Sequence, residues 1–153
     1  MTSPISPTQR AAGRLRQAVK RRVDHEHRAQ VAVMTYATLA RREFPELALL
    51  FAIPNGGHRN VIVAKKLKAE GVKPGVPDLF LPVPRAHWHG LFIELKVEGG
   101  QVSELQQQWH VALMQQGYRV AVCYGSHDAL GVLQQYLALP AAAGANRGGM
   151  DHE

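Results

Sequence analysis

A glutamate and a lysine two positions apart, Glu94 and Lys96, interrupt an otherwise apolar run in the middle of the chain. Side chains alternate between the two faces of a β-strand, so the two charged groups would share one face and the apolar residues the other. One interpretation is an ion pair that faces solvent, which would contribute about 0–1 kcal/mol to stability. The other interpretation is that this pair belongs to a catalytic site.

Asp78 supplies the further group that a catalytic interpretation needs. It lies in a predicted strand over 75–83, and the loop 84–90 that follows is short enough to pair this strand with the one that contains Glu94. Two carboxylates at one sheet edge repel each other unless a cation lies between them, and oxygen ligands suit Mg²⁺ or Mn²⁺. Lys96 could then reach a metal-bound water or a phosphoryl oxygen, which is what phosphodiester hydrolysis requires.

The composition favours an anionic partner. The chain has 153 residues, a hydrophobic content of 46% and a formal charge of +6, which together indicate one basic domain with a substantial core. A basic surface attracts polyanions such as nucleic acid. An anionic membrane surface is the competing partner, but no run of about 18 apolar residues is present to cross a bilayer.

Cysteine usage and the N-terminal sequence predict a cytoplasmic protein. Cys123 is the single cysteine, so it cannot form an internal disulfide, and its apolar neighbours predict a buried thiol in a reducing compartment. The first 22 residues lack the apolar segment of a signal peptide. They contain two prolines, a glycine and six basic residues, which predict a flexible basic arm, and residues 140–153 predict a disordered tail.

Between these ends, residues 23–139 predict one α/β domain. Ser103 is expected to cap a helix, with Gln106 as the partner that completes a capping box. Because a helix separates them, strands 91–97 and 118–125 should pair in parallel with a right-handed crossover. The expected elements are a helix over 24–43, a short strand in 47–54, a helix over 60–71, strands over 75–83 and 91–97, a helix over 103–117, a strand over 118–125 and a helix over 126–139.

The order of these motifs resembles the virus-type replication-repair nuclease (VRR-NUC) domain of the PD-(D/E)xK nuclease superfamily. The segments that carry the likeness are GVPDLFL, GLFIELKVEGGQVSELQQQW, the Asn-Gly loop that precedes a helix, and a glutamate followed four residues later by glutamine, Glu26 and Gln30. The resemblance covers about Asp24 to Leu137. It implies a restriction-endonuclease-like fold, in which helices flank a mixed β-sheet core.

The resemblance also implies roles for individual residues. The implied metal ligands are Asp78, Glu94, the backbone carbonyl of Leu95 and, from the first helix, Glu26; Lys96 would be the catalytic lysine and Gln106 would line the site. The implied cofactor is Mg²⁺ or Mn²⁺. Two alternatives remain open, because Glu26 could be a solvated charge at a helix start and Gln106 could serve only in the capping box.

The eight histidines raise the possibility of zinc, since His25 and His27, or His87 and His89, are close in sequence. Residues two apart on a helix point in different directions and only one cysteine is present, so no zinc site is expected. Trp88, between the second pair, could stack on nucleic acid or form a dimer contact.

DNA is the expected substrate, recognised through its backbone shape rather than its sequence. Phosphate contacts are expected from the basic arm and from Asn55, Arg59, Lys65, Lys66 and Lys68. Small phage and bacterial relatives imply a homodimer that cuts branched DNA, above all the four-way (Holliday) junction, with no membrane involved and in a bacterial or phage-infected cell. The alternatives are a flap or single-strand nuclease of the same fold, a branched-DNA-binding module that does not cut, and a basic scaffold. Apolar residues in 47–51 or Trp88 are the candidates for the dimer contact.

Overall fold

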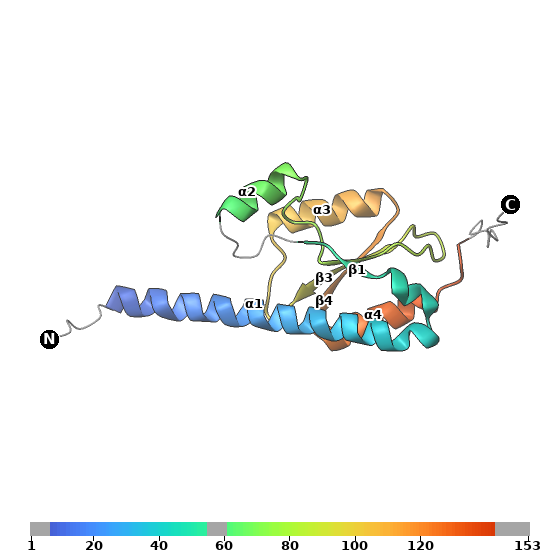
Figure 1. Cartoon of the computed structure of the whole chain (residues 1–153), viewed down its shortest axis with the longest axis horizontal. Helices are drawn as coiled ribbons and strands as arrows, with labels where there is room; N and C mark the ends of the chain where they lie inside the picture. The colour runs from blue at the N-terminus through green and yellow to red at the C-terminus, as the bar shows by residue number, and fades with distance from the viewer. Residues whose placement is uncertain (1–6, 55–60, 143–153) are drawn as a thin grey trace.

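The computed structural model describes residues 7–54 and 61–142, which form a mixed sheet between two helical layers (Figure 1). Helices α1 and α4 cover one face of the sheet, and α3 covers the other with α2 beside it. The elements in chain order are α1 (Pro7–Leu39), the short 3₁₀ helices η1 (Ala40–Arg42) and η2 (Pro45–Leu49), β1 (Phe51–Ala52), α2 (Val61–Ala69), β2 (Leu79–Leu81), β3 (Leu91–Lys96), α3 (Glu104–Gln115), β4 (Arg119–Tyr124) and α4 (Ser126–Leu137). The predicted α/β class with a helix-flanked mixed sheet is confirmed.

The strands lie in the order β1-β2-β3-β4. β2 is antiparallel to both β1 and β3, whereas β3 and β4 are parallel and joined through α3, as the sequence predicts. Leu79 pairs with Ile93, so continuing this register by one residue places Asp78 opposite Glu94. The hairpin therefore brings the two predicted carboxylates to the same end of the sheet.

The apolar face of β3 lies against α1 and α4. Ile93 and Leu95 are buried in the core cluster, together with Leu133 and Tyr136 of α4. The Tyr136 hydroxyl donates a hydrogen bond of 2.7 Å to the Val83 carbonyl, which gives this buried polar group a partner. Alternation along the strand turns Glu94 to the opposite face, under α3.

Helix α1 begins much earlier than the sequence analysis predicts. The expectation of a flexible arm is wrong from Pro7 onwards, because residues from Pro7 to Asp24 are helical. This first part of α1 extends beyond the body of the domain (Figure 1), and the helix enters the core only with Val33 and Ala37. The first six residues of the expected arm lie outside the described residues.

Several other expectations need correction or qualification. Trp88, which the sequence suggests as a contact to nucleic acid or to a second copy, is partly buried and packs against the core. In the segment proposed as a dimer contact, Leu47 and Leu50 are core residues, which leaves Leu49 and Phe51 exposed. Of the expected tail, residues 140–142 are described, and Pro140 accepts a backbone hydrogen bond of 2.7 Å from the Ala86 N–H.

Cys123 in β4 is completely buried, as predicted, and burial raises the pKa of its thiol to about 12. No described helix is both long and apolar enough to cross a membrane.

Candidate active site

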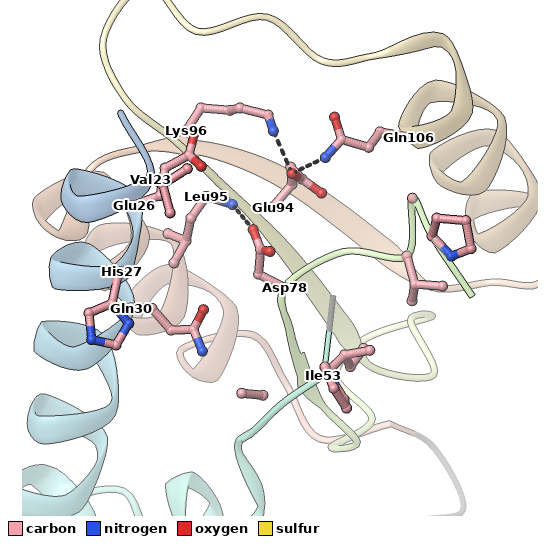
Figure 2. A pocket seen from close by; sticks show the side chains of 15 residues that line it. Val23, Glu26, His27, Gln30, Ile53, Asp78, Glu94, Leu95, Lys96 and Gln106 are labelled. Carbon is pink, nitrogen blue, oxygen red and sulfur yellow. Dashed lines mark hydrogen bonds and ion pairs between the residues drawn. The ribbon is translucent and has the colours of Figure 1, made fainter. Parts of the chain in front are cut away.

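Glu94 lies at the centre of a buried polar cluster under the first turn of α3 (Figure 2). Its side chain is only 1% exposed, so the solvent-facing ion pair considered from the sequence is excluded. Glu94 Oε1 accepts hydrogen bonds from Lys96 Nζ at 2.8 Å and from Gln106 Nε2 at 2.5 Å. Glu94 Oε2 is also buried but has no hydrogen-bond partner among the described residues. A buried carboxylate oxygen without a partner is costly, which suggests that a ligand completes the cluster.

The charges around Glu94 favour a bound cation. Burial, and after it the neighbouring Asp78 and Glu26 carboxylates, raise the pKa of Glu94 to about 7 against the opposing effect of Lys96. The carboxylate is therefore destabilised by the two acidic residues with which the sequence analysis groups it. A divalent cation between Asp78 and Glu94 would relieve this repulsion.

Asp78 is held by backbone N–H groups on the two sides of β2, one from β3 and one from the residue that follows β1. Its Oδ2 accepts a hydrogen bond of 2.7 Å from the Leu95 N–H, and its own carbonyl accepts one of 2.8 Å from the Ile53 N–H. Pro77, just before it, is fully buried. The aspartate is thus fixed at the entrance of β2, where its second carboxylate oxygen can face the cluster.

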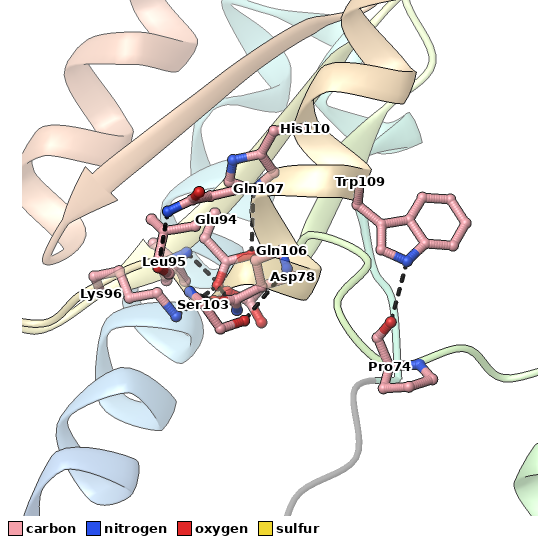
Figure 3. Close-up of polar contacts among 11 residues, drawn as sticks. Pro74, Asp78, Glu94, Leu95, Lys96, Ser103, Gln106, Gln107, Trp109 and His110 are labelled. Atoms are coloured by element: carbon pink, nitrogen blue, oxygen red, sulfur yellow. Dashed lines mark hydrogen bonds and ion pairs between the residues drawn. The ribbon is translucent and has the colours of Figure 1, made fainter.

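Helix α3 anchors the loop that leads to Asp78 (Figure 3). Trp109 Nε1 donates a hydrogen bond of 3.1 Å to the Pro74 carbonyl. Gly75 has φ +86°, and a Cβ at this position would lie 2.7 Å from Leu105 Cγ, so only glycine fits here. The close packing of this loop on α3 fixes the distance between the helix and the aspartate.

Gln106 has both of the roles that the sequence left open. It completes the capping box of α3, because its Oε1 accepts from the Ser103 N–H at 2.9 Å while its own N–H donates to Ser103 Oγ at 3.3 Å. The side-chain nitrogen of the same amide donates to Glu94. The start of the helix therefore orients a carboxylate in the sheet.

One cavity brings together every residue that the sequence analysis predicts as catalytic or metal-binding. Its volume is about 620 Å³. The predicted residues among those that line it are Glu26, Asp78, Glu94, Leu95, Lys96 and Gln106, and Figure 2 shows them on α1, just before β2, on β3 and on α3.

Three residues near this cavity were not predicted as site residues. His27 and Gln30 of α1 line it next to Glu26. His110 is buried, and its Nε2, which has no hydrogen-bond partner among the described residues, lies 3.8 Å from Glu94 Oε2. Burial, followed by the nearby Lys96, lowers the pKa of His110. Its position four residues after Gln106, on the same helix face, is the sequence signal that could have identified it.

Of the residues predicted to contact DNA, the three lysines of α2 do not line this cavity. Asn55 and Arg59 fall outside the described residues. Lys65, Lys66 and Lys68 are exposed on α2, and none of them lines the cavity; Lys66 Nζ lies 3.8 Å from Glu70 Oε1.

The donor set fits a hard divalent cation that keeps several of its waters. In the ranges 7–54 and 61–142, no three or more His, Cys, Asp or Glu side chains are grouped so that they could hold a metal by themselves. Mg²⁺ commonly binds through one or two carboxylates and completes its shell with water or substrate phosphate. Asp78 and Glu94 meet that requirement, since Glu94 Oε2 makes no hydrogen bond within the described part of the chain.

Comparisons with known proteins show the family of the chain. The family model of the VRR-NUC domain matches residues 10–127, more than half of the chain. A solved structure described as a "VRR_NUC domain protein" is 30% identical in sequence, with a TM-score of 0.66 over 78% of this chain and 93% of its own. No curated protein gives a significant match. The chain therefore belongs to the VRR-NUC domain family, whose members are nucleases of the PD-(D/E)xK type that act on DNA.

Proposed function

We propose that this chain is a Mg²⁺- or Mn²⁺-dependent endonuclease that hydrolyses phosphodiester bonds in branched DNA. The observation that carries the proposal is the buried Glu94 carboxylate. One of its oxygens is bonded to Lys96 and Gln106, and the other has no hydrogen-bond partner among the described residues. Asp78, Glu94 and the Leu95 carbonyl would hold the metal, and Glu26 would add a further carboxylate from α1.

Each residue has a separate task in hydrolysis. The bound metal would lower the pKa of a water and withdraw charge from the phosphoryl oxygens. Lys96 would stabilise the negative charge that builds up on the phosphate, while Gln106 keeps Glu94 oriented. The water oxygen forms a bond to phosphorus as the bond to the leaving 3′ oxygen breaks, and that oxygen takes up a proton. The products would be a 5′-phosphate and a 3′-hydroxyl.

The proposed substrate is the four-way junction, cut by a homodimer. A two-fold symmetric dimer presents two equivalent sites, which matches the two equivalent strands of such a junction. The likeness to stand-alone family members supports this assignment. Flap or single-strand cleavage by the same site is the alternative within the family.

The test is cleavage of labelled four-way junction, 5′-flap, splayed-arm and linear duplex DNA with Mg²⁺ or Mn²⁺. Lys96→Ala should lower the rate roughly 10²–10³-fold, the usual loss when one group that stabilises transition-state charge is removed. Lys20→Ala, an exposed lysine on the outer part of α1, is the control and should leave the rate at saturating DNA unchanged.

The outcomes separate the candidate functions. Paired, symmetric nicks in the junction that disappear in Lys96→Ala support a dimeric resolvase. Preferential cutting of flaps or single strands would keep the chemistry and replace the substrate. Tight binding of junctions without cutting, at any divalent metal tested, would favour a binding module that does not cut.

A further inference from the structure

A second cavity lies on the other flank of α1. Its volume is about 690 Å³, and its lining residues come from α1, the carboxyl ends of β3 and β4 and the start of α4. Figure 1 shows the arrangement of these elements. The side chains that give it its character are Arg21, Arg22, His25 and Arg28 from α1, together with Lys96 and Glu98 from the end of β3. We call it the basic cavity.

The three arginines of the basic cavity form no ion pair with any residue that the structure describes. All three are exposed, and none makes a hydrogen bond with another described residue. Glu98 is the one acidic residue among those that line the cavity. Like charges held on one helix face repel each other, and a polyanion would relieve that repulsion.

The basic cavity adjoins the catalytic cavity at Lys96, which lines both. Arg22 lies at the boundary between the two cavities. Gly100 lies close to both Arg22 and Lys96, since a Cβ built on this glycine would lie 3.2 Å from Arg22 Nη2 and 3.5 Å from Lys96 Cβ. Arg22 also precedes Glu26 by four residues, so the two side chains are neighbours on α1. A positive surface therefore begins directly beside the predicted catalytic residues.

The helical period explains why one helix can serve two cavities. Arg21, His25 and Arg28 recur at intervals of four and three residues, so they share one flank of α1. Glu26 and Gln30 also share a face, turned towards the catalytic cavity. A helix with side chains is about 10–12 Å across, so α1 can contact two neighbouring stretches of one nucleic acid backbone at once.

We propose that the basic cavity binds phosphates of the DNA substrate next to the bond that is cut, with Arg21 and Arg28 as the main contacts. The assignment rests on the proposed nuclease function and adds to it a second point of attachment. Arginine suits this task because its planar guanidinium can donate two parallel hydrogen bonds to a phosphate. The strand would run from the carboxylates, past Lys96 and Arg22, to the opposite flank of α1.

The experiment measures binding separately from cleavage. Affinity for fluorescently labelled duplex and four-way junction DNA is measured by anisotropy in Ca²⁺ at several salt concentrations, for the unchanged chain and for a double variant with Arg21→Ala and Arg28→Ala. Each lost phosphate contact should lower the slope of log affinity against log salt by about 0.9 on duplex DNA, so the double variant should lose roughly 2.

Two further variants make the comparison specific. Arg41→Ala with Arg42→Ala removes the same charge from two other exposed arginines, in η1, and should leave the slope unchanged. Arg21→Lys with Arg28→Lys keeps the charge and should restore most of the slope. In cleavage assays the double alanine variant should raise KM and leave kcat unchanged.

Two results would overturn the basic cavity as a phosphate site: an unaltered salt slope in the Arg21 and Arg28 alanine variant, or an equal loss of slope in the Arg41 and Arg42 variant. Either result would leave the nuclease proposal intact. If the unchanged chain bound neither DNA form, both proposals would fall together.

Discussion

At the scale of single residues, Glu94 lies in an environment that destabilises an ionised carboxylate. It is buried, it faces Asp78, and one of its oxygens has no partner among the described residues. A fold that needed only stability would do better with a neutral or apolar side chain here. Such a cost is typical of sites that are completed by a ligand.

The raised pKa of Glu94 predicts how stability depends on pH in the metal-free protein. An unfolded glutamate titrates near 4.5, whereas Glu94 in the folded protein titrates near 7 because it is buried and faces Asp78. The folded state therefore holds the proton more tightly. The contribution is fully present below about pH 4.5 and is lost as pH rises through 7, by about 3 kcal/mol.

Glu94→Gln isolates this contribution. Its free energy of unfolding, measured by urea in EDTA, should be close to that of the unchanged chain at pH 5 and higher at pH 8. Saturating Mn²⁺ should stabilise the unchanged chain and leave the variant unaffected. A difference in unfolding free energy that stayed constant from pH 5 to pH 8 would contradict this account of Glu94.

At the scale of elements, the start of α3 links a helix cap to the carboxylate cluster. The capping box could be predicted from the sequence, since serine followed three residues later by glutamine is its usual pattern. The second hydrogen bond of Gln106 could not, because it depends on how closely α3 lies over β3. His110 lies one helical turn after Gln106, so the spacing could have placed it on the same face, but its 3.8 Å approach to Glu94 Oε2 depends on the same packing.

Ser103→Ala should therefore affect both the helix and the site. The loss of the cap should lower the free energy of unfolding by about 1 kcal/mol. It also leaves the Gln106 side chain less constrained, so the cleavage rate at saturating DNA should fall as well. Thr38→Ala is the control, since it removes an exposed hydroxyl that is bonded to the Met34 carbonyl within α1. Equal stability of the two variants in urea would show that the capping box has no special role.

Helix α1 shows why element boundaries are difficult to predict. Pro7 counted against a helix in the sequence, but it is the first residue of α1, where proline is favourable because its missing N–H would have no helical partner. Gly13 costs about 1 kcal/mol in a helix, and the many alanines and arginines around it compensate. Because α1 begins at Pro7, the basic residues that were expected in a flexible arm lie at helical spacing.

At the scale of the whole molecule, the pairing of the central strands could be predicted from the sequence more accurately than the composition of the surface cavities. The short loop after β2 and the helix between β3 and β4 leave few topologies, so the antiparallel and parallel pairs could be predicted. The basic cavity depends on three segments of the chain that are distant in sequence, and no local pattern reveals such a meeting. Trp88 was misjudged because burial is a property of the assembled domain.

The proposed homodimer makes a prediction at this largest scale. β1 is an edge strand of the sheet, and large apolar side chains are exposed beside it, Leu49 at 53% and Phe51 at 48%. An exposed edge with apolar side chains favours association with another chain. We expect the chain to sediment as a dimer, and Leu49→Glu with Phe51→Glu to shift it to the monomer, because two charges cannot be buried unpaired at an interface.

The matched control for that shift is Val111→Glu with Met114→Glu, which changes two side chains of α3 that are 50% and 47% exposed. This variant should remain dimeric, since it adds the same charge to a surface outside the proposed contact. If the control became monomeric and the Leu49 and Phe51 variant did not, the dimer contact would lie on α3. If the unchanged chain sedimented as a monomer both alone and on junction DNA, the two sites needed for paired nicks would be missing, and a single-cut nuclease would replace the resolvase.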